Sequence, residues 1–411
     1  VGQTLVFSFI GMTSVEMTLK NTEPLTVVLK EEATEREEVV ITGIYSRKKE
    51  SFTGSSQTYT HKELKMIGNT NVLQSLKTID PSFAIIENNQ FGSDPNTLPD
   101  INVRGKTSVV GLTQEYDTDP NQTLFILDGF ESTLQAISDL SMDRVESITI
   151  LKDAASAAIY GARAANGVIL ITTKQGKRKE KATLTYSGYV GMQTPTALPE
   201  LVTGRQYMEL SNEAMSAAGF SRPYDVDAFE KYDSGMYPNE YSNTDWVNEI
   251  FKKHALQTSH SVSVRGGSEK SSYFMSYGYL DQDGLVVGDA FKTKRHNARI
   301  NVNTEVFDRL KINGNVSFVD YYRNASGFSG TGGVFRLAQR MSPLLPVKWQ
   351  QQNEMGLWED TEYWSSGSIN NPVYVATEGG EEKRKSRTLN TIVSADLRII
   401  DGLNLGGQYA A

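Results

Sequence analysis

Cysteine is absent from this 411-residue sequence, and tryptophan is scarce, with 4 residues against 19 Tyr and 16 Phe. A chain without cysteine forms no disulfides and no thiolate metal sites. Long apolar runs are also missing. The longest, such as the run from Val168 to Ile171, fall far short of the roughly 20 residues that a membrane helix requires. These absences exclude a helical membrane protein but not one built from alternating strands, whose average hydropathy resembles that of a water-soluble protein.

Acidic residues outnumber basic residues. The chain carries 41 Lys and Arg against 49 Asp and Glu, a formal net charge of -8, and an acidic protein is poorly matched to a phosphate backbone. We therefore expect no nucleic-acid partner. No leader peptide is visible and the first residue is Val1, so we expect either a removed leader or a start inside a longer gene product.

Catalytic and cofactor motifs are missing as well. The sequence contains no His-Glu-x-x-His, no Gly-x-x-x-x-Gly-Lys-Ser/Thr and no Gly-x-Gly-x-x-Gly that opens a helix. The four histidines, at positions 61, 254, 260 and 296, lie in separate segments without metal-ligand spacing. We expect no enzyme, no cofactor and no metal site.

The first 45 residues divide into two parts. Residues 1–30 contain short apolar strands from Thr4 to Ile10 and from Leu25 to Leu29, which suggest the end of a small β-sandwich. Residues 31–45 begin as a glutamate-rich linker and then reach the β-branched run Val39-Val40-Ile41. This run is interpreted as an unpaired strand that can join another sheet; the alternative is an edge strand of the preceding sandwich.

Residues 46–176 have a mixed α and β pattern typical of a compact globular unit. Helical spacing extends over residues 61–66 and 71–79, and strands are predicted at 101–104, 123–127, 145–151 and 167–173. An Ala-rich segment between the last two strands predicts a short helix that starts at Asp153 and ends at Gly161.

From residue 182 to 411 the pattern has a period of two. We count about seven alternating segments of roughly ten residues, the length that crosses a bilayer at a tilt. The connections alternate between short turns and longer loops, the longest being 193–255 and 322–385. Outer-membrane barrels have this asymmetry, whereas a soluble β-sandwich has no reason to enforce it.

The motif Leu151-Lys-Asp-Ala-Ala-Ser-Ala-Ala-Ile-Tyr-Gly-Ala-Arg-Ala-Ala-Asn-Gly-Val-Ile-Leu-Ile-Thr-Thr-Lys174 resembles the plug signature of SusC/RagA-type TonB-dependent transporters. Further pieces follow the order of that family. The segment Glu38-Val39-Val40-Ile41-Thr42-Gly43 resembles a TonB box, and the pairs Arg104-Gly105 and Asp128-Gly129 resemble later plug elements. The signature positions are Leu151, Lys152, Asp153, Tyr160, Gly161, Arg163, Asn166 and Gly167.

The resemblance implies a fold and a set of partners. The fold is an α+β plug domain followed by antiparallel strands of a transmembrane β-barrel, preceded by the remnant of a small β-sandwich. Barrels of this class close roughly 22 strands, so we expect this chain to be a fragment. The implied partners are TonB, a SusD-like surface lipoprotein and outer-membrane lipid, with the plug and the N-terminal region facing the periplasm.

Two sets of side chains have open roles. Arg104, Lys152, Arg163 and Asp128 either contact the barrel or stabilise turns of the plug itself. The loop 322–385 carries Trp349, Trp358, Tyr363 and Trp364, which suit stacking on sugar rings, contacts to peptides, docking of the lid lipoprotein, or packing within the loop.

The leading hypothesis is therefore active import of an oligosaccharide or similar nutrient. Import of peptides or of a metal chelate by the same fold is a second hypothesis. A soluble β-rich protein for glycan binding or adhesion is a third, from a different class. An enzyme is the weakest, because no nucleophile, base and oxyanion site can be assembled from the sequence.

Overall fold

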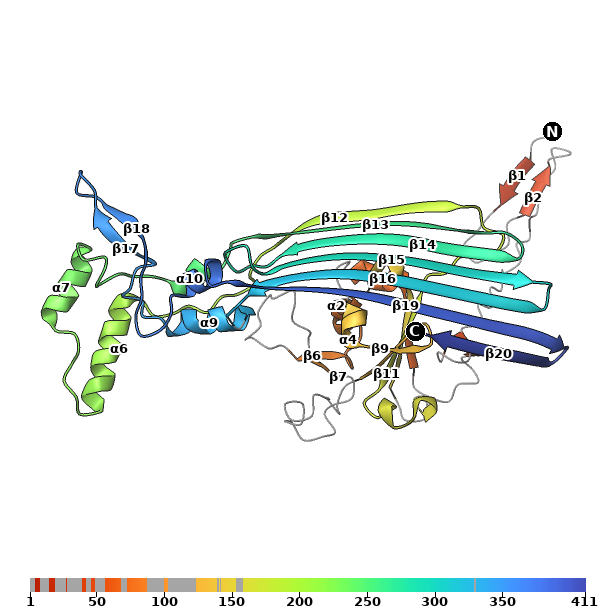
Figure 1. The fold of residues 1–411 in the computed structure, drawn as a ribbon, viewed down its shortest axis with the longest axis horizontal. Helices are drawn as coiled ribbons and strands as arrows, with labels where there is room; N and C mark the ends of the chain where they lie inside the picture. The colour runs from red at the N-terminus through yellow and green to blue at the C-terminus, as the bar shows by residue number, and fades with distance from the viewer. Residues whose placement is uncertain are drawn as a thin grey trace.

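The computed structural model describes residues 4–7, 15–18, 27, 39–41, 46–48, 56–67, 72–86, 100–102, 123–138, 140, 142–152, 158–328 and 330–411. Three bodies follow one another in Figure 1: a mixed α/β unit, a sheet of long strands against which this unit lies, and a group of helices and a hairpin at one end of the sheet. We call the first the plug and the second the wall.

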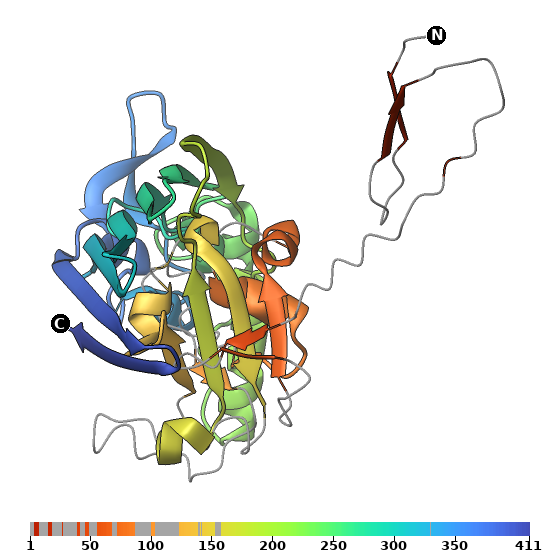
Figure 2. The ribbon, with the colours of Figure 1, turned by 90° about the vertical axis from the view of Figure 1, so that its right-hand side faces the viewer.

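The N-terminal segments form two short ribbons. Strand β1 (Thr4–Phe7) pairs with β2 (Val15–Thr18), and β3 (Val39–Ile41) pairs with β4 (Ser46–Lys48). The β1–β2 ribbon lies well apart from the other elements (Figure 2). The prediction of an unpaired strand at 39–41 is wrong, because its backbone pairs locally with β4, and among the described strands β3 pairs with no strand of a sandwich. Strand β2 was not predicted, and the strand predicted at 25–29 falls outside the described residues.

The plug is built on a five-stranded sheet of order β5-β10-β11-β8-β9, in which only the β8–β11 pairing is parallel. Its strands are β5 (Ser56–Thr60), β8 (Leu124–Leu127), β9 (Phe130–Ser132), β10 (Val145–Leu151) and β11 (Val168–Thr173). A second, two-stranded sheet joins β6 (Ala84–Ile86) to β7 (Asp100–Asn102). The helical elements are α1 (His61–Ile67), α2 (Val72–Ile79), α4 (Leu134–Ser138), η2 (Met142–Arg144) and η3 (Ala158–Ala164).

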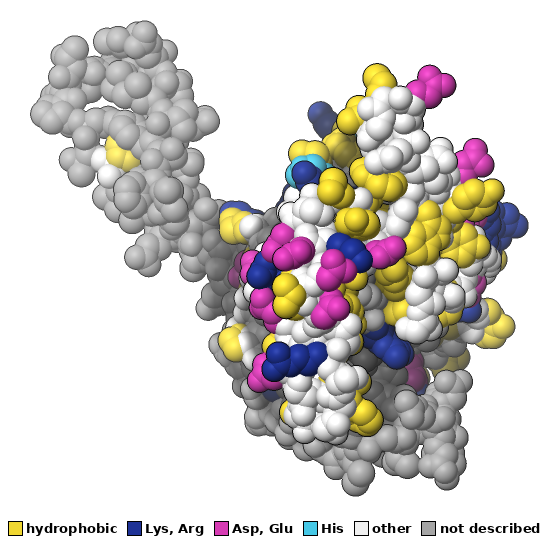
Figure 3. Space-filling view, turned by 90° about the vertical axis from the view of Figure 1, so that its left-hand side faces the viewer, with side chains coloured by type: hydrophobic (Ala, Val, Ile, Leu, Met, Phe, Trp, Pro, Cys, Tyr) yellow, Lys and Arg dark blue, Asp and Glu magenta, His cyan; other side chains and the backbone are white. Residues whose placement is uncertain are grey.

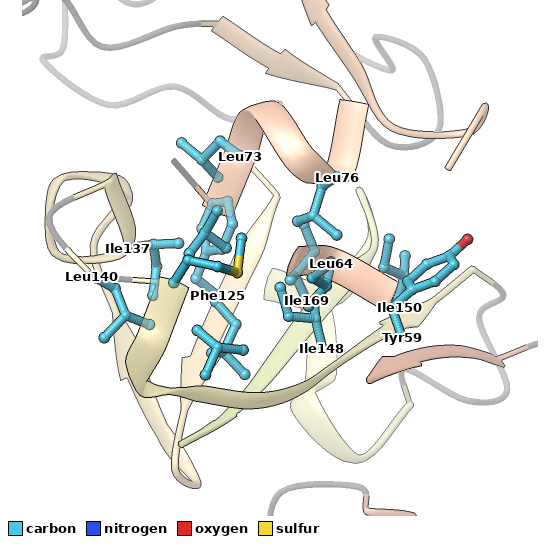
Figure 4. Packing of buried hydrophobic residues seen from close by; sticks show 14 of the residues in the cluster. Tyr59, Leu64, Leu73, Leu76, Phe125, Ile137, Leu140, Ile148, Ile150 and Ile169 are labelled. Carbon is cyan, nitrogen blue, oxygen red and sulfur yellow. The ribbon is translucent and has the colours of Figure 1, made fainter. Parts of the chain in front are cut away.

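The plug core forms where the helices cover one face of this sheet. Leu64 of α1 and Leu76 of α2 are fully buried and lie near Ile148 and Ile169 of the sheet (Figure 4). Leu73 of α2 is also fully buried and lies on the side of Phe125. The apolar positions of α2 repeat at helical spacing and form one stripe, which explains why this segment is a helix and which side it buries. The predicted helices at 61–66 and 71–79 are confirmed to within one residue.

The Ala-rich segment departs from its prediction. Residues 153–157 are not described, and the next seven residues form 3-10 turns that are interrupted at Gly161, whose φ is 66° and ψ -152°. The described part of the predicted helix is a 3-10 turn that ends at Gly161 as predicted, but a further 3-10 turn follows it. A glycine in this conformation bends the chain between the two turns.

The wall is a seven-stranded antiparallel sheet whose strands follow chain order, with β12 and β20 at its edges. The strands are β12 (Thr183–Gln193), β13 (Ala255–Gly267), β14 (Ser271–Asp283), β15 (Lys292–Val306), β16 (Leu310–Ser326), β19 (Glu381–Ile400) and β20 (Leu403–Ala410). The predicted number and the alternation of short and long connections are confirmed. The strands have 8 to 20 residues, so most are longer than the predicted ten.

The two faces of the wall are reversed relative to a soluble sheet. Apolar side chains such as Leu184, Val190 and Met192 are about 70% exposed on one face. On the other face Ser276, Asn297 and similar polar residues are less than a tenth exposed. A sheet in water buries its apolar face, so this arrangement matches a barrel strand that faces lipid outside and a polar lumen inside.

The connections at one end of the wall fold together into what we call the loop lobe, comprising residues 194–254, 284–291 and 327–380. Its elements are α6 (Gly204–Ala217), α7 (Val226–Ser234), α8 (Trp246–Ile250), α9 (Gly330–Arg340), β17 (Lys348–Gln352), β18 (Trp358–Trp364) and α10 (Pro372–Thr377). They were not predicted, although N-caps at Thr203, Asp225, Asp245 and Asn371 mark four of the helices.

None of the helices in the described part of the chain is long and apolar enough to span a membrane.

Candidate functional site

The seam between plug and wall is centred on Asp128. Asp128 and Gly129 form the tight turn between β8 and β9, with φ of 50° and 91°, a conformation that favours Asp or Asn followed by Gly. The Asp128 carboxylate accepts hydrogen bonds from the backbone N–H and the Oγ1 of Thr173, both at 2.8 Å. The turn and strand β11 thereby hold the carboxylate in one orientation.

The same carboxylate reaches the wall. Arg299 of β15 donates from its Nη2 to Asp128 Oδ2, and Asn315 of β16 donates its Nδ2 to that oxygen at 3.4 Å. Asp128 is therefore bound on one side by the plug and on the other by two wall strands. Charged hydrogen bonds in a place that excludes water are the strongest polar contacts available to such a seam.

A second plug cation lies beside this pair. Arg144 is buried and donates from Nη1 to Asn297 Oδ1 of the wall at 3.4 Å. Burial, followed by repulsion from Arg299, lowers the pKa of Arg144 to about 9, while the Asp128 charge opposes that shift. At neutral pH Arg144 keeps its charge, so the negative charge of Asp128 balances the guanidinium groups of both Arg299 and Arg144.

Further contacts extend the seam towards both ends of the wall. Arg295 donates from Nη1 to the Ser138 carbonyl oxygen at 3.2 Å, and Asn303 donates its Nδ2 to Gln175 Oε1 at 3.4 Å. At Gly176 the chain passes so close to β14 that an added Cβ would lie 2.3 Å from the Tyr273 carbonyl oxygen. The plug is thus fitted to the polar face of the wall.

The other predicted charges of the plug bond within it. Lys152 pairs with Asp80, whose side chain is completely buried, at 3.0 Å from Nζ to Oδ2. Arg163 pairs with Glu131, and both side chains are more than half exposed. Of the two roles left open for these groups, Asp128 takes the barrel contact, whereas Lys152 and Arg163 stabilise the plug.

The remaining signature residues lie around the second small core of the plug. Leu151 is buried there, and Tyr160 packs against it. Asn166 is buried and its carbonyl accepts from Thr123 Oγ1 at 3.4 Å, while Gly167 has a φ of 92°. Outside the described residues lie Glu38, Thr42, Gly43, Arg104, Gly105 and Asp153.

The loop lobe is a packed body rather than a set of separate loops. Trp246 is 1% exposed and donates from Nε1 to the Ser342 carbonyl oxygen at 2.8 Å. Asn239 makes two hydrogen bonds with the Gln350 backbone, at 2.9 and 2.8 Å. A shared apolar core joins the three connections through residues such as Ile250, Val286 and Ala338.

The four aromatic candidates of this lobe differ in surroundings. Trp364 packs against the lobe core, with Lys348 Nζ 4.8 Å from its ring centroid. Trp349 is half-buried. Trp358 and Tyr363 on strand β18 are exposed, Tyr363 at 74%. Of the four candidates, these two are the exposed ones.

Sequence reasoning missed the wall's share of the seam. Arg299 and Asn315 of the wall were not singled out, nor was Arg144 of the plug, although for Arg299 one signal was available. In strands that alternate polar and apolar residues, an arginine on the polar side must face the lumen and needs a counter-charge there.

Two features together define the class of protein. A mixed α/β unit is bonded to the polar face of an antiparallel sheet, and the other face of that sheet is apolar and exposed. This is the plug and barrel-wall arrangement of TonB-dependent receptors. Residues 48–168 match the TonB-dependent Receptor Plug Domain family. Residues 48–168 are therefore assigned to that plug-domain family, and the chain as a whole is similar to TonB-dependent receptors of the SusC/RagA type.

Relatives and solved structures agree with this assignment. The TonB-dependent receptor SusC of Bacteroides thetaiotaomicron is 28% identical over 100% of this chain and 40% of its own length. The TonB-dependent receptor P26 of Formosa agariphila is 29% identical over 80% of this chain and 31% of its own length. The chain thus spans two fifths or less of these relatives.

The fold is shared with the RagAB peptide importer. In its open-open state the TM-score is 0.68 at 22% identity, covering 91% of this chain and 42% of that one. In the closed-closed state the TM-score is 0.66 at 24% identity, covering 88% and 41%.

Proposed function

We propose that this chain serves TonB-dependent import of a nutrient, with oligosaccharides as the leading substrate class, across the bacterial outer membrane. The observation that carries the proposal is the reversed polarity of the wall together with the ionic seam at Asp128 and Arg299. A sheet that exposes its apolar face requires lipid, and a plug bonded to its polar face blocks the lumen until it is moved. The alternative of a soluble adhesin predicts recovery from cells without detergent, which membrane fractionation tests.

The energy-coupling segment in this proposal is residues 38–43. A two-stranded ribbon such as β3–β4 is marginally stable alone, so β3 can exchange its partner or add a further strand from TonB by backbone hydrogen bonds. Force applied there reaches the plug, which begins nearby in sequence at β5.

This coupling is tested in the full-length receptor by nutrient uptake. Proline at Val40 removes a backbone donor, so Val40→Pro should reduce TonB-dependent uptake to the level of a strain without TonB. Val40→Ala keeps the donor and should retain most of the uptake. Equal uptake by both variants would refute the role of this segment.

Substrate contact is assigned to the loop lobe and the upper side of the plug. Trp358 and Tyr363 offer exposed rings for sugar stacking. Replacing both by Ala should weaken binding of the imported oligosaccharide, whereas Trp364→Phe should change binding little because Trp364 packs inward. The RagAB importer transports peptides, which makes peptides the second substrate class. Uptake of labelled peptides but not of oligosaccharides would select that class.

A SusD-like lipoprotein is proposed as the partner of the lobe. Hydrophobic side chains gather in patches on the lobe end of the molecule (Figure 3). Met355 and Leu357 at the β17–β18 tip and Phe220 beyond α6 are at least 60% exposed. A photo-crosslinker at Met355 should capture the lipoprotein, and one at Phe307 in the turn between β15 and β16, at the opposite end of the wall, should not. Capture from Phe307 alone would contradict the proposed orientation, in which the lobe faces the outside of the cell.

A further inference from the structure

The outward face of the wall changes character abruptly along its strands. Cross-strand partners form rows, and five successive rows carry no charged side chain. From the turn end, the outward residues of β16 in these rows are Leu310, Ile312, Gly314, Val316 and Phe318, and those of β19 are Leu397, Ala395, Val393, Thr391 and Leu389. The neighbouring strands supply residues such as Tyr277, Ile300 and Val302.

The next three rows towards the loop lobe are charged. The first contains His260, Tyr279, His296, Asp320 and Arg387; the second contains Thr258, Asp281, Lys294, Tyr322 and Lys385; the third contains Asp283, Lys292, Asn324 and Lys383. Five cations and three carboxylates therefore share this belt, which we call the collar.

Three cations of the collar stand further out than their carboxylate partners, whereas Lys292 and Asp283 are about equally exposed, at 34% and 36%. The side chain of Lys385 is 51% exposed and that of Arg387 is 64% exposed, whereas Asp320, which both contact at 3.5 and 3.6 Å, is 23% exposed. Lys294 is 46% exposed and its partner Asp281 is 31% exposed, at 3.4 Å. Recessed carboxylates orient the amines and leave positive charge at the surface.

The position of the collar coincides with the expected limit of the hydrocarbon. Five rows separated by two residues each extend about 27 Å along a strand at roughly 3.4 Å per residue. At the usual tilt of about 40° this corresponds to roughly 21 Å, close to the apolar band of about 25 Å in outer-membrane barrels. The collar therefore begins where the strands leave the membrane on the lobe side, and Tyr279 and Tyr322 lie there as interfacial aromatics do.

We propose that the collar binds the phosphorylated headgroups of outer-leaflet lipid, with Lys294, Lys385 and Arg387 as the phosphate contacts. Charge complementarity and direct continuity with the apolar band favour this occupant, since a lipid whose chains cover the band places its headgroup at the collar. Lysine and arginine on such a surface extend towards anionic headgroups and bond their phosphate oxygens. The inference rests on the proposed location of the wall in the outer membrane.

The test uses the full-length receptor reconstituted in nanodiscs with either a bisphosphorylated glycolipid (lipid A) or the same lipid after dephosphorylation. Native mass spectrometry measures the lipid that stays bound. The triple variant Lys294→Gln, Lys385→Gln, Arg387→Gln should retain less phosphorylated lipid by on the order of tenfold. Retention of the dephosphorylated lipid should be unchanged.

A matched control removes exposed, ion-paired cations at the opposite end of the wall. Lys179→Gln with Lys270→Gln should leave lipid retention at the wild-type level, because these residues, which pair with Glu269 and Asp308, lie at the turn end of the wall, away from the collar. The single variants Lys294→Gln and Lys385→Gln, which disturb the fold least, should each show a partial loss. Wild-type retention in both single variants, or equal losses for the two lipids, would overturn the proposal. If the receptor fractionates with the outer membrane in that case, the import function stands and only the collar's role fails.

Discussion

Asp128 of the plug and Arg299 of the wall form an ion pair whose side chains are only 9% and 2% exposed. The two residues are 171 positions apart in sequence. The carboxylate is held by Thr173 on its own side and by Asn315 on the other. Any movement that takes the plug out of the wall must break this contact and rehydrate both charges.

Replacing Asp128 by Asn should loosen the plug. Asn keeps the turn conformation and can still bond Thr173, but it leaves Arg299 and Arg144 buried without their shared counter-charge, a cost of about 3–5 kcal/mol. A cysteine introduced at Gln175, in a full-length receptor with no other accessible cysteine, reports plug release through its labelling rate, which should rise. The control Glu131→Gln breaks an exposed pair and should change that rate little. Combining Asp128→Asn with Arg299→Met should recover part of the loss, and full additivity would argue against the pair.

Replacing Lys152 by Met should destabilise the plug itself. Asp80 is completely buried and Lys152 is its partner at 3.0 Å, so removal of the cation strands a buried carboxylate at a cost of about 3–5 kcal/mol. Chemical unfolding followed by plug-specific fluorescence measures the change. Exposed Lys77, at the C-terminal end of α2, provides a matched control, and Lys77→Met should have a much smaller effect. A Lys152→Met variant as stable as wild type would show that the remaining hydrogen bonds, from Ser82 and Tyr59, satisfy Asp80 without the cation.

Acid should weaken the plug through the same carboxylate. Burial would raise the pKa of Asp80, but hydrogen bonds from Ser82 and the Lys152 contact outweigh burial and lower that pKa below 3.8. Because the folded-state pKa is depressed, the stabilisation is present above pH 3.8 and is lost as pH falls through the folded pKa. The free energy of unfolding, measured between pH 5 and the acid limit of the assay, should fall with decreasing pH, and Asp80→Asn should flatten that dependence. If the pH dependence of the free energy of unfolding is the same in Asp80→Asn and wild type, the acid sensitivity arises from other groups.

A methyl group at Gly176 should disturb the exit of the chain from plug to wall. The added Cβ would meet the Tyr273 backbone at 2.3–2.6 Å, and backbone cannot move aside as a flexible side chain does. Overpacking of this kind costs about 1–3 kcal/mol, so Gly176→Ala should lower the thermal midpoint of the receptor. Gly314→Ala is the control, since nothing lies within 4 Å of its Cβ position. Equal midpoints for both variants would mean that the segment shifts freely.

A lysine at Val302 tests the lipid-facing side of the wall. Val302 lies in the middle one of the five uncharged rows, where a charge costs about 2–4 kcal/mol in a bilayer. Val302→Lys should reduce the folded fraction in a heat-modifiability assay, whereas Thr258→Lys, in the collar, should have little effect. Tolerance of lysine at Val302 would contradict a lipid-facing role for this face.

The structure bears out the predicted plug helices and wall strands and adds the contacts between distant segments. Plug helices and wall strands were found from periodicity, because an amphipathic stripe or an alternating strand records its own burial pattern in neighbouring residues. The predictions failed where the same local sequence pattern is compatible with two different structures. The run at 39–41 pairs with β4, and the Ala-rich segment continues past Gly161 in a second 3-10 turn, because pairing and continuation depend on surroundings that composition does not record.

Sequence by itself determined that there are seven wall strands, which of their faces is apolar, which connections are long, and where the plug lies along the chain. These features depend on residues within a few positions of one another. Only the tertiary structure decided that Asp128 meets Arg299, that Lys152 belongs to Asp80, and that three loops share one core around Trp246. Such pairings join segments far apart in the chain, and they form only when two whole surfaces have already been placed against each other.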